Sequence, residues 1–371
     1  MNYDNNINVF FELVKAGLWG KDVILSPYDK INWDEIYQLA AEQSVIGVVL
    51  AGIESSNIKP PQELLLQWIG DVQMLEKQNK TMNKFIAELI EKMRTADIYT
   101  LLVKGQGVAQ CYKRPLWRVS GDVDFYLSDD NFVKAKKFFR PLVSKFDPDN
   151  DHSKHINMYY REWVVEIHAN QHCSLSARVN RVMDEIHRNL FFGGNVRSWN
   201  NGNTQVFLPS PDNDVLIIFV HYLNHFYKGG LGVRQICDWC RLMWTYKDSL
   251  NYGLLETRLR KAGLMNVWKA FATFAVEYLG MPKVAMPFYS SEKKWKRKAE
   301  KISAFVLKVG NFGHNRDSSY YENESRMRRK FYSLRRRCKD MLHHARIFPL
   351  ETLRFFPNMV YNGLIAVVRG E

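Results

Sequence analysis

The stretch that most constrains the fold is LLVKGQGVAQCYKRPLWRVSGDVDFYL, residues 101–127. Its two ends are apolar and short enough for buried strands, and two acids, Asp122 and Asp124, precede the second apolar run. Side chains two residues apart on a strand point to the same face, roughly 6–7 Å from each other. Two like charges on a half-buried face repel each other and are costly to desolvate. A cation between them would relieve both costs, so the pattern predicts a metal site.

The surrounding chain predicts an α+β fold, in which a mixed sheet is flanked by helical regions. Residues 1–95 form the predicted N-terminal helical region, because apolar residues recur there at three- and four-residue spacing, for example over 33–50. A longer helix is expected after Pro60-Pro61. Residues 96–209 form the predicted core, and 210–371 a C-terminal helical region with a basic tail.

Within the core, several short segments have the patterns of strands and helix starts. Residues 98–103 are apolar and β-rich, as in a buried strand. Ser128 is the expected N-cap of a helix over 129–142, which begins with acids and ends with bases, as the helix dipole prefers. Residues 155–169 predict a hairpin with a turn at Arg161-Glu162.

A third acid lies in the second strand of that hairpin. Glu166 and His168 share one face of the segment, and Trp163, Val165 and Ile167 share the other. With Asp122 and Asp124, Glu166 would complete an oxygen-only ligand set for Mg²⁺ or Mn²⁺. Two such ions about 4 Å apart activate an attacking hydroxyl and stabilise a leaving pyrophosphate. His168 is expected to orient these acids or to lie in the core.

The turn before the predicted helix near residue 108 is a candidate phosphate-binding element. Gly105 and Gly107 could present backbone N–H groups to phosphate oxygens, and Lys104 and Arg118 could add positive charge. Gly121, before the acidic pair, belongs to the same predicted nucleotide-binding set. Two interpretations of Arg118 stay open: a nucleotide contact, or a structural partner of Asp122 or Asp124.

The C-terminal third is predicted to be helical. Ser210-Pro211 has the pattern of a helix start, and helices are expected over 215–227, 233–246 and 254–279. Pro349 and Pro357 are expected to interrupt any long helix near the end.

Two motifs in these helices resemble metal sites. His221 and His225 have the spacing of a zinc pair, but the sequence indicates no third ligand, so a polar seam between helices is favoured. Cys237 and Cys240 form a single C-x-x-C, and Asp238 between them is a candidate cleft residue.

The formal net charge is +13, and the surplus lies in the C-terminal region, while the first hundred residues carry more acids than bases. The electrostatic field of this positive surplus favours anionic partners. The basic tail is compatible with nucleic acid, an acidic protein or an anionic membrane surface. A solvated helical face is the alternative. Five scattered cysteines exclude a disulfide framework. No signal peptide or transmembrane segment is expected, so the predicted location is cytoplasmic.

The combination of Lys104-Gly105, Arg118 followed by Gly121-Asp122-Val123-Asp124, and Val165-Glu166-Ile167-His168 resembles the nucleotidyltransferase superfamily related to DNA polymerase beta. It is most similar to a group of uncharacterised bacterial nucleotidyltransferase-like proteins. The similarity extends over roughly residues 95–245. It implies that Asp122 and Asp124 are the metal-binding pair, with Glu166 as third carboxylate. This chain differs from the usual pattern at Gln106, Glu166 and Ala169.

The sequence and this resemblance together predict a metal-dependent nucleotidyltransferase that uses Mg²⁺ or Mn²⁺. It would transfer a nucleoside monophosphate from a nucleoside triphosphate to an acceptor hydroxyl and release pyrophosphate, with Glu166 helping to deprotonate the acceptor. The acceptor is open: a small molecule, a saccharide, a protein or a nucleic acid. The alternative is a catalytically inactive protein of this fold that acts as a binding or regulatory scaffold through its basic tail.

Overall fold

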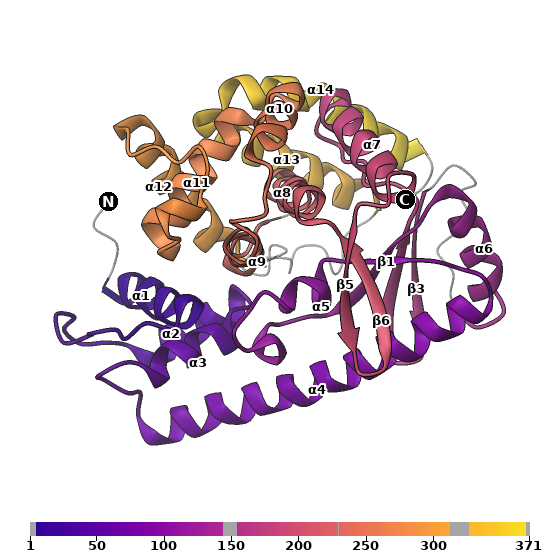
Figure 1. Ribbon diagram of the computed structural model, residues 1–371. Helices are drawn as coiled ribbons and strands as arrows, with labels where there is room; N and C mark the ends of the chain where they lie inside the picture. Colours follow the sequence, from indigo (N-terminus) through magenta and orange to yellow (C-terminus); the bar gives the residue numbers. More distant parts are fainter. Residues whose placement is uncertain (1–4, 144–153, 229, 312–325, 369–371) are drawn as a thin grey trace.

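The computed structural model describes residues 5–143, 154–228, 230–311 and 326–368 (Figure 1). Helices surround a small mixed sheet, so the predicted α+β class is confirmed. Figure 1 shows the N-terminal helices and the sheet above one long helix, α4, and the C-terminal helices above both.

The N-terminal region contains four helices. They are α1 (Asn5–Trp19), α2 (Trp33–Glu42), α3 (Ile46–Glu54) and α4 (Gln62–Thr95). The predicted helical segment over 33–50 is interrupted, because Ser44 has a φ of 56° and the chain changes direction there. Helices α1 and α3 pack through glycines: a Cβ on Gly17 would lie 1.8 Å from the carbonyl oxygen of Val48. Backbone approach this close excludes any larger residue.

Helix α4 belongs to two hydrophobic cores. Its 34 residues span about 51 Å at 1.5 Å per residue. Trp68 and Val72 in its first half pack with the N-terminal and C-terminal helices. Phe85 and Leu89 in its second half pack with the sheet. The helix therefore connects the predicted N-terminal region to the predicted core.

The central sheet has four strands in the order β1-β2-β4-β3. Their bounds are β1 (Leu101–Val103), β2 (Asp122–Tyr126), β3 (His155–Tyr160) and β4 (Trp163–His168). Strands β2 and β4 are parallel, and the two other pairings are antiparallel. The predicted hairpin is confirmed as β3–β4.

Three short helices connect these strands. They are α5 (Gly105–Ala109), the 3₁₀ turn η1 (Pro115–Trp117) and α6 (Asp129–Phe139). Ser128 caps α6 as predicted, since its side chain accepts a bond from the backbone N–H of Asn131.

The two faces of the sheet are chemically different. Val123 and Phe125 of β2, with Val165 and Ile167 of β4, lie in the core shared with α4. Asp122 and Asp124 occupy the alternate positions and face the other way, as the period of two requires. That other face lies toward the C-terminal helices.

Two elements between 177 and 209 were not predicted from the sequence. Helix α7 (Ala177–Phe191) is followed by a hairpin of β5 (Val196–Asn201) and β6 (Thr204–Pro209). Strand β6 packs beside β1 and α4 and closes that side of the core.

The C-terminal region is helical, as predicted. It comprises α8 (Pro211–Lys228), α9 (Val233–Thr245), α10 (Tyr252–Ala262), α11 (Met265–Leu279), the 3₁₀ turn η2 (Lys283–Ala285), α12 (Lys293–Val309), α13 (Arg326–Ile347) and α14 (Pro349–Val368). Among the described residues, every helix is too short or too polar to cross a membrane.

Two expectations for this region were wrong. The predicted single helix over 254–279 is two helices, because Gly263 ends α10 with a φ of 72° in the left-handed region. Pro357 lies inside α14 and does not end it, whereas the break expected at Pro349 is confirmed, since α13 ends at Ile347 and α14 begins at Pro349.

Candidate active site

The pairing of β2 with β4 brings the three predicted acids together. Asp124 lies opposite Glu166 in this parallel register, and Asp122 lies two residues before Asp124 on the same face. One carboxylate oxygen from each of the three acids lies within 4.8 Å of the other two. Three carboxylates this close repel each other unless cations or hydrogen-bond donors intervene. Oxygen donors from rigid strands are the ligand type that Mg²⁺ and Mn²⁺ prefer.

Lys104 supplies one such cation from the turn between β1 and α5. Its Nζ lies 2.8 Å from Asp124 Oδ1, and burial alone would lower the pKa of Lys104, but Asp124 and Glu166 raise it. The backbone of Lys104 has a φ of 57°, and Gly105 follows with 35°. A positive φ at a lysine is strained, and such strain persists where the surroundings impose it. The turn therefore fixes an ammonium group against Asp124.

His168 bonds to the same oxygen of Asp124 as Lys104 does. Its Nε2 lies 2.9 Å from Asp124 Oδ1 and 3.4 Å from Glu166 Oε2. Burial alone would lower the pKa of His168, but hydrogen bonds to Asp124 and Glu166 raise it. The predicted orienting role of His168 agrees with these contacts.

The pKa values of the three acids are shifted in different directions. Burial and the neighbouring Asp124 raise the pKa of Asp122. Burial alone would raise the pKa of both Asp124 and Glu166. Lys104 and His168 nevertheless lower the pKa of Asp124. Hydrogen bonds from His155 and His168 hold the pKa of Glu166 well below its usual range. Glu166 is thus a stable anion and a weak proton acceptor in this arrangement.

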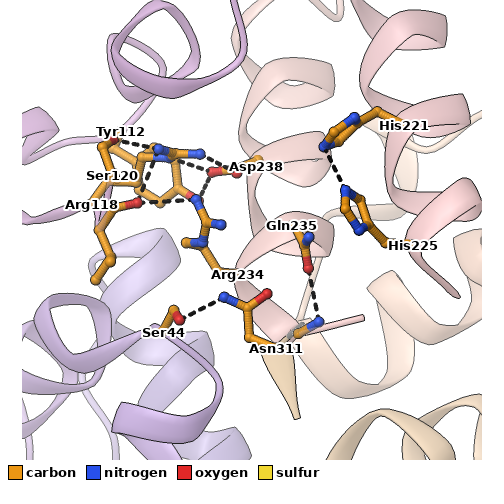
Figure 2. A network of polar contacts seen from close by, with 12 residues as sticks. Ser44, Tyr112, Arg118, Ser120, His221, His225, Arg234, Gln235, Asp238 and Asn311 are labelled. Carbon is orange, nitrogen blue, oxygen red and sulfur yellow. Dashed lines mark hydrogen bonds and ion pairs between the residues drawn. The ribbon is translucent and has the colours of Figure 1, made fainter. Parts of the chain in front are cut away.

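Arg118 pairs with Asp238 rather than with Asp122 or Asp124. Its Nε and Nη2 donate to the two oxygens of Asp238 at 2.9 and 2.6 Å (Figure 2). Tyr112 Oη donates to Asp238 Oδ1 at 2.8 Å, and Arg118 Nη1 donates to Ser120 Oγ at 2.6 Å. This buried network joins α9 to the loop that leads into β2, and so it fixes the position of the acidic pair.

Gln106, where the chain departs from the usual pattern, has a structural partner. Its Nε2 donates to Asn79 Oδ1 of α4 at 2.7 Å. Asn79 Nδ2 in turn donates to the carbonyl oxygens of Leu116 and Arg118 at 2.8 and 2.9 Å. The larger side chain therefore ties the Lys104 turn and the loop before β2 to the long helix.

A cleft of about 110 Å³ lies between the sheet and helices α8 and α9. It is lined by Lys104, Gly105, Arg118, Gly121, Asp122, Asp124, Ile218, His221, Tyr222, Arg234, Gln235 and Asp238. This volume is below the usual range for a whole ligand, so the enclosed part suits a small polar group and its ion.

The two other predicted glycines have different surroundings. A Cβ on Gly121 would meet no atom within 4 Å, which leaves open space at the cleft wall. A Cβ on Gly107 would lie 2.8 Å from Leu208 Cδ2, and Gly107 does not line the cleft. Gly107 therefore permits α5 to pack against β6.

Arg234 is a cleft residue that was not predicted from the sequence. Its Nη1 donates to the carbonyl oxygen of Val119 at 3.1 Å, and its buried Nε has no hydrogen-bond partner in the described part of the chain. Burial and the neighbouring Arg118 lower the pKa of Arg234. In the sequence, Arg234 lies four residues before Asp238, which places both side chains on the same face of a helix. This spacing could have indicated that Arg234 lies in the cleft.

The zinc-like motifs do not form metal clusters within the described residues. His221 Nε2 and His225 Nε2 lie 3.1 Å apart, and neither joins a group of three potential ligands there. Burial lowers the pKa of His225 to about 4, which keeps it neutral. Cys237 and Cys240 are fully buried in α9, and burial raises the pKa of the Cys237 thiol. His221 lines the cleft, and Cys237 and Cys240 belong to the hydrophobic core.

Comparison with known proteins identifies a family. The model of the family described as uncharacterised nucleotidyltransferase matches residues 29–280, more than half of the chain. No curated protein and no solved structure matches the chain. The matched segment contains the sheet, the three acids, the Arg118–Asp238 pair and Arg234. The chain therefore belongs to the uncharacterised nucleotidyltransferase family.

Proposed function

We propose that this protein is a metal-dependent nucleotidyltransferase that moves a nucleoside monophosphate from a nucleoside triphosphate to an acceptor hydroxyl. The observation that carries the proposal is the convergence of Asp122, Asp124 and Glu166 beside the Lys104-Gly105 turn. Phosphoryl chemistry of this kind depends mainly on positioning and on charge neutralisation. The site contains acidic and basic side chains in fixed positions that can carry out both tasks.

The residues fit a divalent cation. Burial, and then repulsion by Asp124, raise the pKa of Asp122, and a cation among the three carboxylates would relieve both effects. Asp122, Asp124 and Glu166 would hold Mg²⁺ or Mn²⁺, with two ions as the predicted stoichiometry. When bound, such ions neutralise phosphate charge and activate the attacking hydroxyl. Because its pKa is low, Glu166 remains charged and is suited mainly to binding the metal, and only secondarily to accepting a proton from the acceptor hydroxyl.

The opposite wall of the cleft suits the phosphates. Lys104 and Arg118 each pair with an acid of the protein, whereas Arg234 forms no ion pair within the described residues. Asp238 and Asp122 attract the Arg234 guanidinium without pairing with it directly, and a phosphate in the cleft would be a direct anionic partner. Gly121 leaves space for a phosphate to approach the backbone. We therefore assign Arg234 to the triphosphate, with Gly105, Gly121 and Lys104 beside it.

Thermal shift with each nucleoside triphosphate and Mg²⁺ tests binding. Wild type is expected to gain stability with metal and nucleotide together, and the double variant Asp122→Asn/Asp124→Asn to lose that gain. Asp130→Asn is the matched control, since Asp130 is exposed in the first turn of α6. Catalysis is tested by incubating triphosphates labelled at the α-phosphate with small-molecule, saccharide, protein and nucleic-acid pools. Failure of wild type to respond to metal plus nucleotide would refute the proposal.

The scaffold alternative has one observation in its favour. The Lys104–Asp124 pair balances the charge of one central acid without a metal. A scaffold would bind nucleotide equally well with and without Mg²⁺, and the two acid substitutions would leave that binding unchanged. The same thermal-shift series therefore separates the two functions.

A further inference from the structure

Two imidazoles and one carboxylate gather at the edge of the acidic site. His155 at the start of β3 lies opposite His168 at the end of β4, and Glu166 precedes His168 by two residues on the same face. Their side chains are 46%, 11% and 20% exposed, so an ion can reach them from solvent. Because the strands are paired directly, the backbone holds all three in place.

The separations of the ligand atoms suit a tetrahedral metal ion. His155 Nε2 and His168 Nε2 lie 3.3 and 3.4 Å from the same oxygen, Glu166 Oε2. A hydrogen bond between charged groups is usually shorter, about 2.7–2.9 Å. In a tetrahedron with metal–ligand distances of about 2.0–2.1 Å, neighbouring ligand atoms lie about 3.3–3.4 Å apart. The observed separations are long for the hydrogen bonds that the two histidines make to Glu166 without an ion, and they match the second geometry.

The two imidazole planes are nearly parallel, so one ring has to rotate for both Nε2 lone pairs to point at one ion. The imidazoles of His155 and His168 stack with centroids 4.4 Å apart and planes inclined by 13°. In this arrangement both Nε2 atoms approach one carboxylate oxygen, and all three ligand atoms lie within 4.8 Å of one another. Imidazole and carboxylate together select zinc and similar transition metals over Mg²⁺.

We propose that His155, Glu166 and His168 form a binding site for a divalent transition-metal ion of the zinc class, with the fourth position open to water. Binding replaces the hydrogen bond that His168 Nε2 makes to Asp124, and any proton on that nitrogen goes to solvent. Lys104 remains paired with Asp124.

The site shares Glu166 with the oxygen-only group formed with Asp122 and Asp124. An ion held by the two histidines withdraws this carboxylate from that group. Zinc would therefore inhibit the transferase reaction, a consequence that rests on the proposed function. The metal binding itself does not depend on that function.

Titration of the purified protein with Co²⁺ tests the site, because tetrahedral Co²⁺ absorbs visible light and Zn²⁺ displaces it without colour. Wild type is expected to bind one equivalent. His155→Gln and His168→Gln are expected to weaken binding by at least the roughly tenfold loss that follows removal of even an outer-shell partner. His172→Gln, at an exposed histidine of the next loop, should bind Co²⁺ like wild type.

The double variant Asp122→Asn/Asp124→Asn shows whether Co²⁺ occupies this site or the oxygen-only group. It is expected to retain the visible absorption band of bound Co²⁺. Retention of full affinity in His155→Gln, or loss of the band in the double variant, would overturn the assignment. Circular dichroism verifies that each variant is folded. The absorption band of bound Co²⁺ is measured without nucleotide or acceptor. The titration therefore tests the metal site even if the protein has no transferase activity.

Discussion

Asp124 of β2 and Glu166 of β4 are direct partners in the only parallel strand pairing among the described strands of the central sheet. Forty-two positions separate them in the chain, yet the register places both on the face toward α8 and α9. Because the two acids lie on paired strands, their spacing cannot change without breaking the sheet.

The first prediction concerns that partnership. Glu166→Gln keeps the shape of the side chain but removes its charge. The apparent affinity for Mg²⁺ plus nucleotide, obtained from thermal stabilisation, should therefore fall by at least about tenfold. Glu162→Gln, in the exposed turn of the same hairpin, is the control and should respond like wild type. Thermal shift across a Mg²⁺ series gives the comparison; equal responses of the two variants would show that Glu166 is not a ligand.

Asp238→Asn should destabilise the fold by about 3–5 kcal/mol, because it leaves the buried Arg118 guanidinium without its anion. Glu54→Gln breaks the exposed pair with Arg114 and should cost less than about 1 kcal/mol. Urea unfolding of both variants measures the difference. Similar losses would indicate that the Arg118–Asp238 pair is not the buried link between α9 and β2.

Arg234→Gln should weaken binding of inorganic triphosphate while leaving the midpoint of thermal unfolding unchanged or higher. Arg118 opposes the charge of Arg234, and the substitution removes one hydrogen bond, to the carbonyl oxygen of Val119, but no ion pair within the described residues. Arg241→Gln on the same helix is the contrast, since its donors bind the carbonyl oxygens of Cys111 and Leu18, and it should lower stability. Calorimetry with triphosphate measures the affinity; undiminished binding by Arg234→Gln would remove Arg234 from the phosphate site.

The pH dependence of stability should contain a contribution from His225. Burial lowers its pKa from 6.5 to about 4, so the folded state favours the neutral ring. A depressed folded-state pKa gives stability that is present above pH 6.5 and lost as the pH falls toward 4, on the order of 2–3 kcal/mol. His225→Gln should show a correspondingly smaller loss of unfolding free energy between pH 7 and pH 4. Parallel curves for the two proteins would contradict the assignment.

The last prediction concerns binding of helix α14 to anionic membranes. Leu350, Leu353 and Tyr361 are 58%, 70% and 64% exposed, and Arg354 lies exposed among them. An apolar helix face beside basic residues favours vesicles that contain anionic lipid. Leu350→Ser/Leu353→Ser should reduce cosedimentation with anionic vesicles severalfold, with neutral phosphatidylcholine vesicles as control. Unchanged cosedimentation would leave the basic residues as a solvated face.

The sequence was most informative where local patterns determine structure. Alternation in Val-Val-Glu-Ile-His placed Glu166 and His168 on one face, and the helix-start patterns at Ser128 and Pro211 indicated two helices correctly. The nucleotidyltransferase family was also predicted and is confirmed. The superfamily relation to DNA polymerase beta stays a prediction.

What the sequence could not provide were contacts between distant segments. Arg118 was predicted near the acids, but its partner Asp238 lies 120 residues away, and nothing local specifies that pairing. His155 lay in the predicted hairpin, yet its closeness to His168 depends on the register that the turn sets. Arg234 lacked a motif altogether. These contacts arise from tertiary packing, which residue spacing alone does not determine.

The long helix α4 affects how this protein can be divided. Its second half supplies Phe85 and Leu89 to the core beneath the sheet, and Asn79 anchors the loop before β2. A fragment beginning at residue 96 would expose that apolar surface to water and would aggregate rather than fold. A fragment that keeps the sheet and its three acids therefore has to begin upstream of Asn79, inside helix α4 and not at a linker.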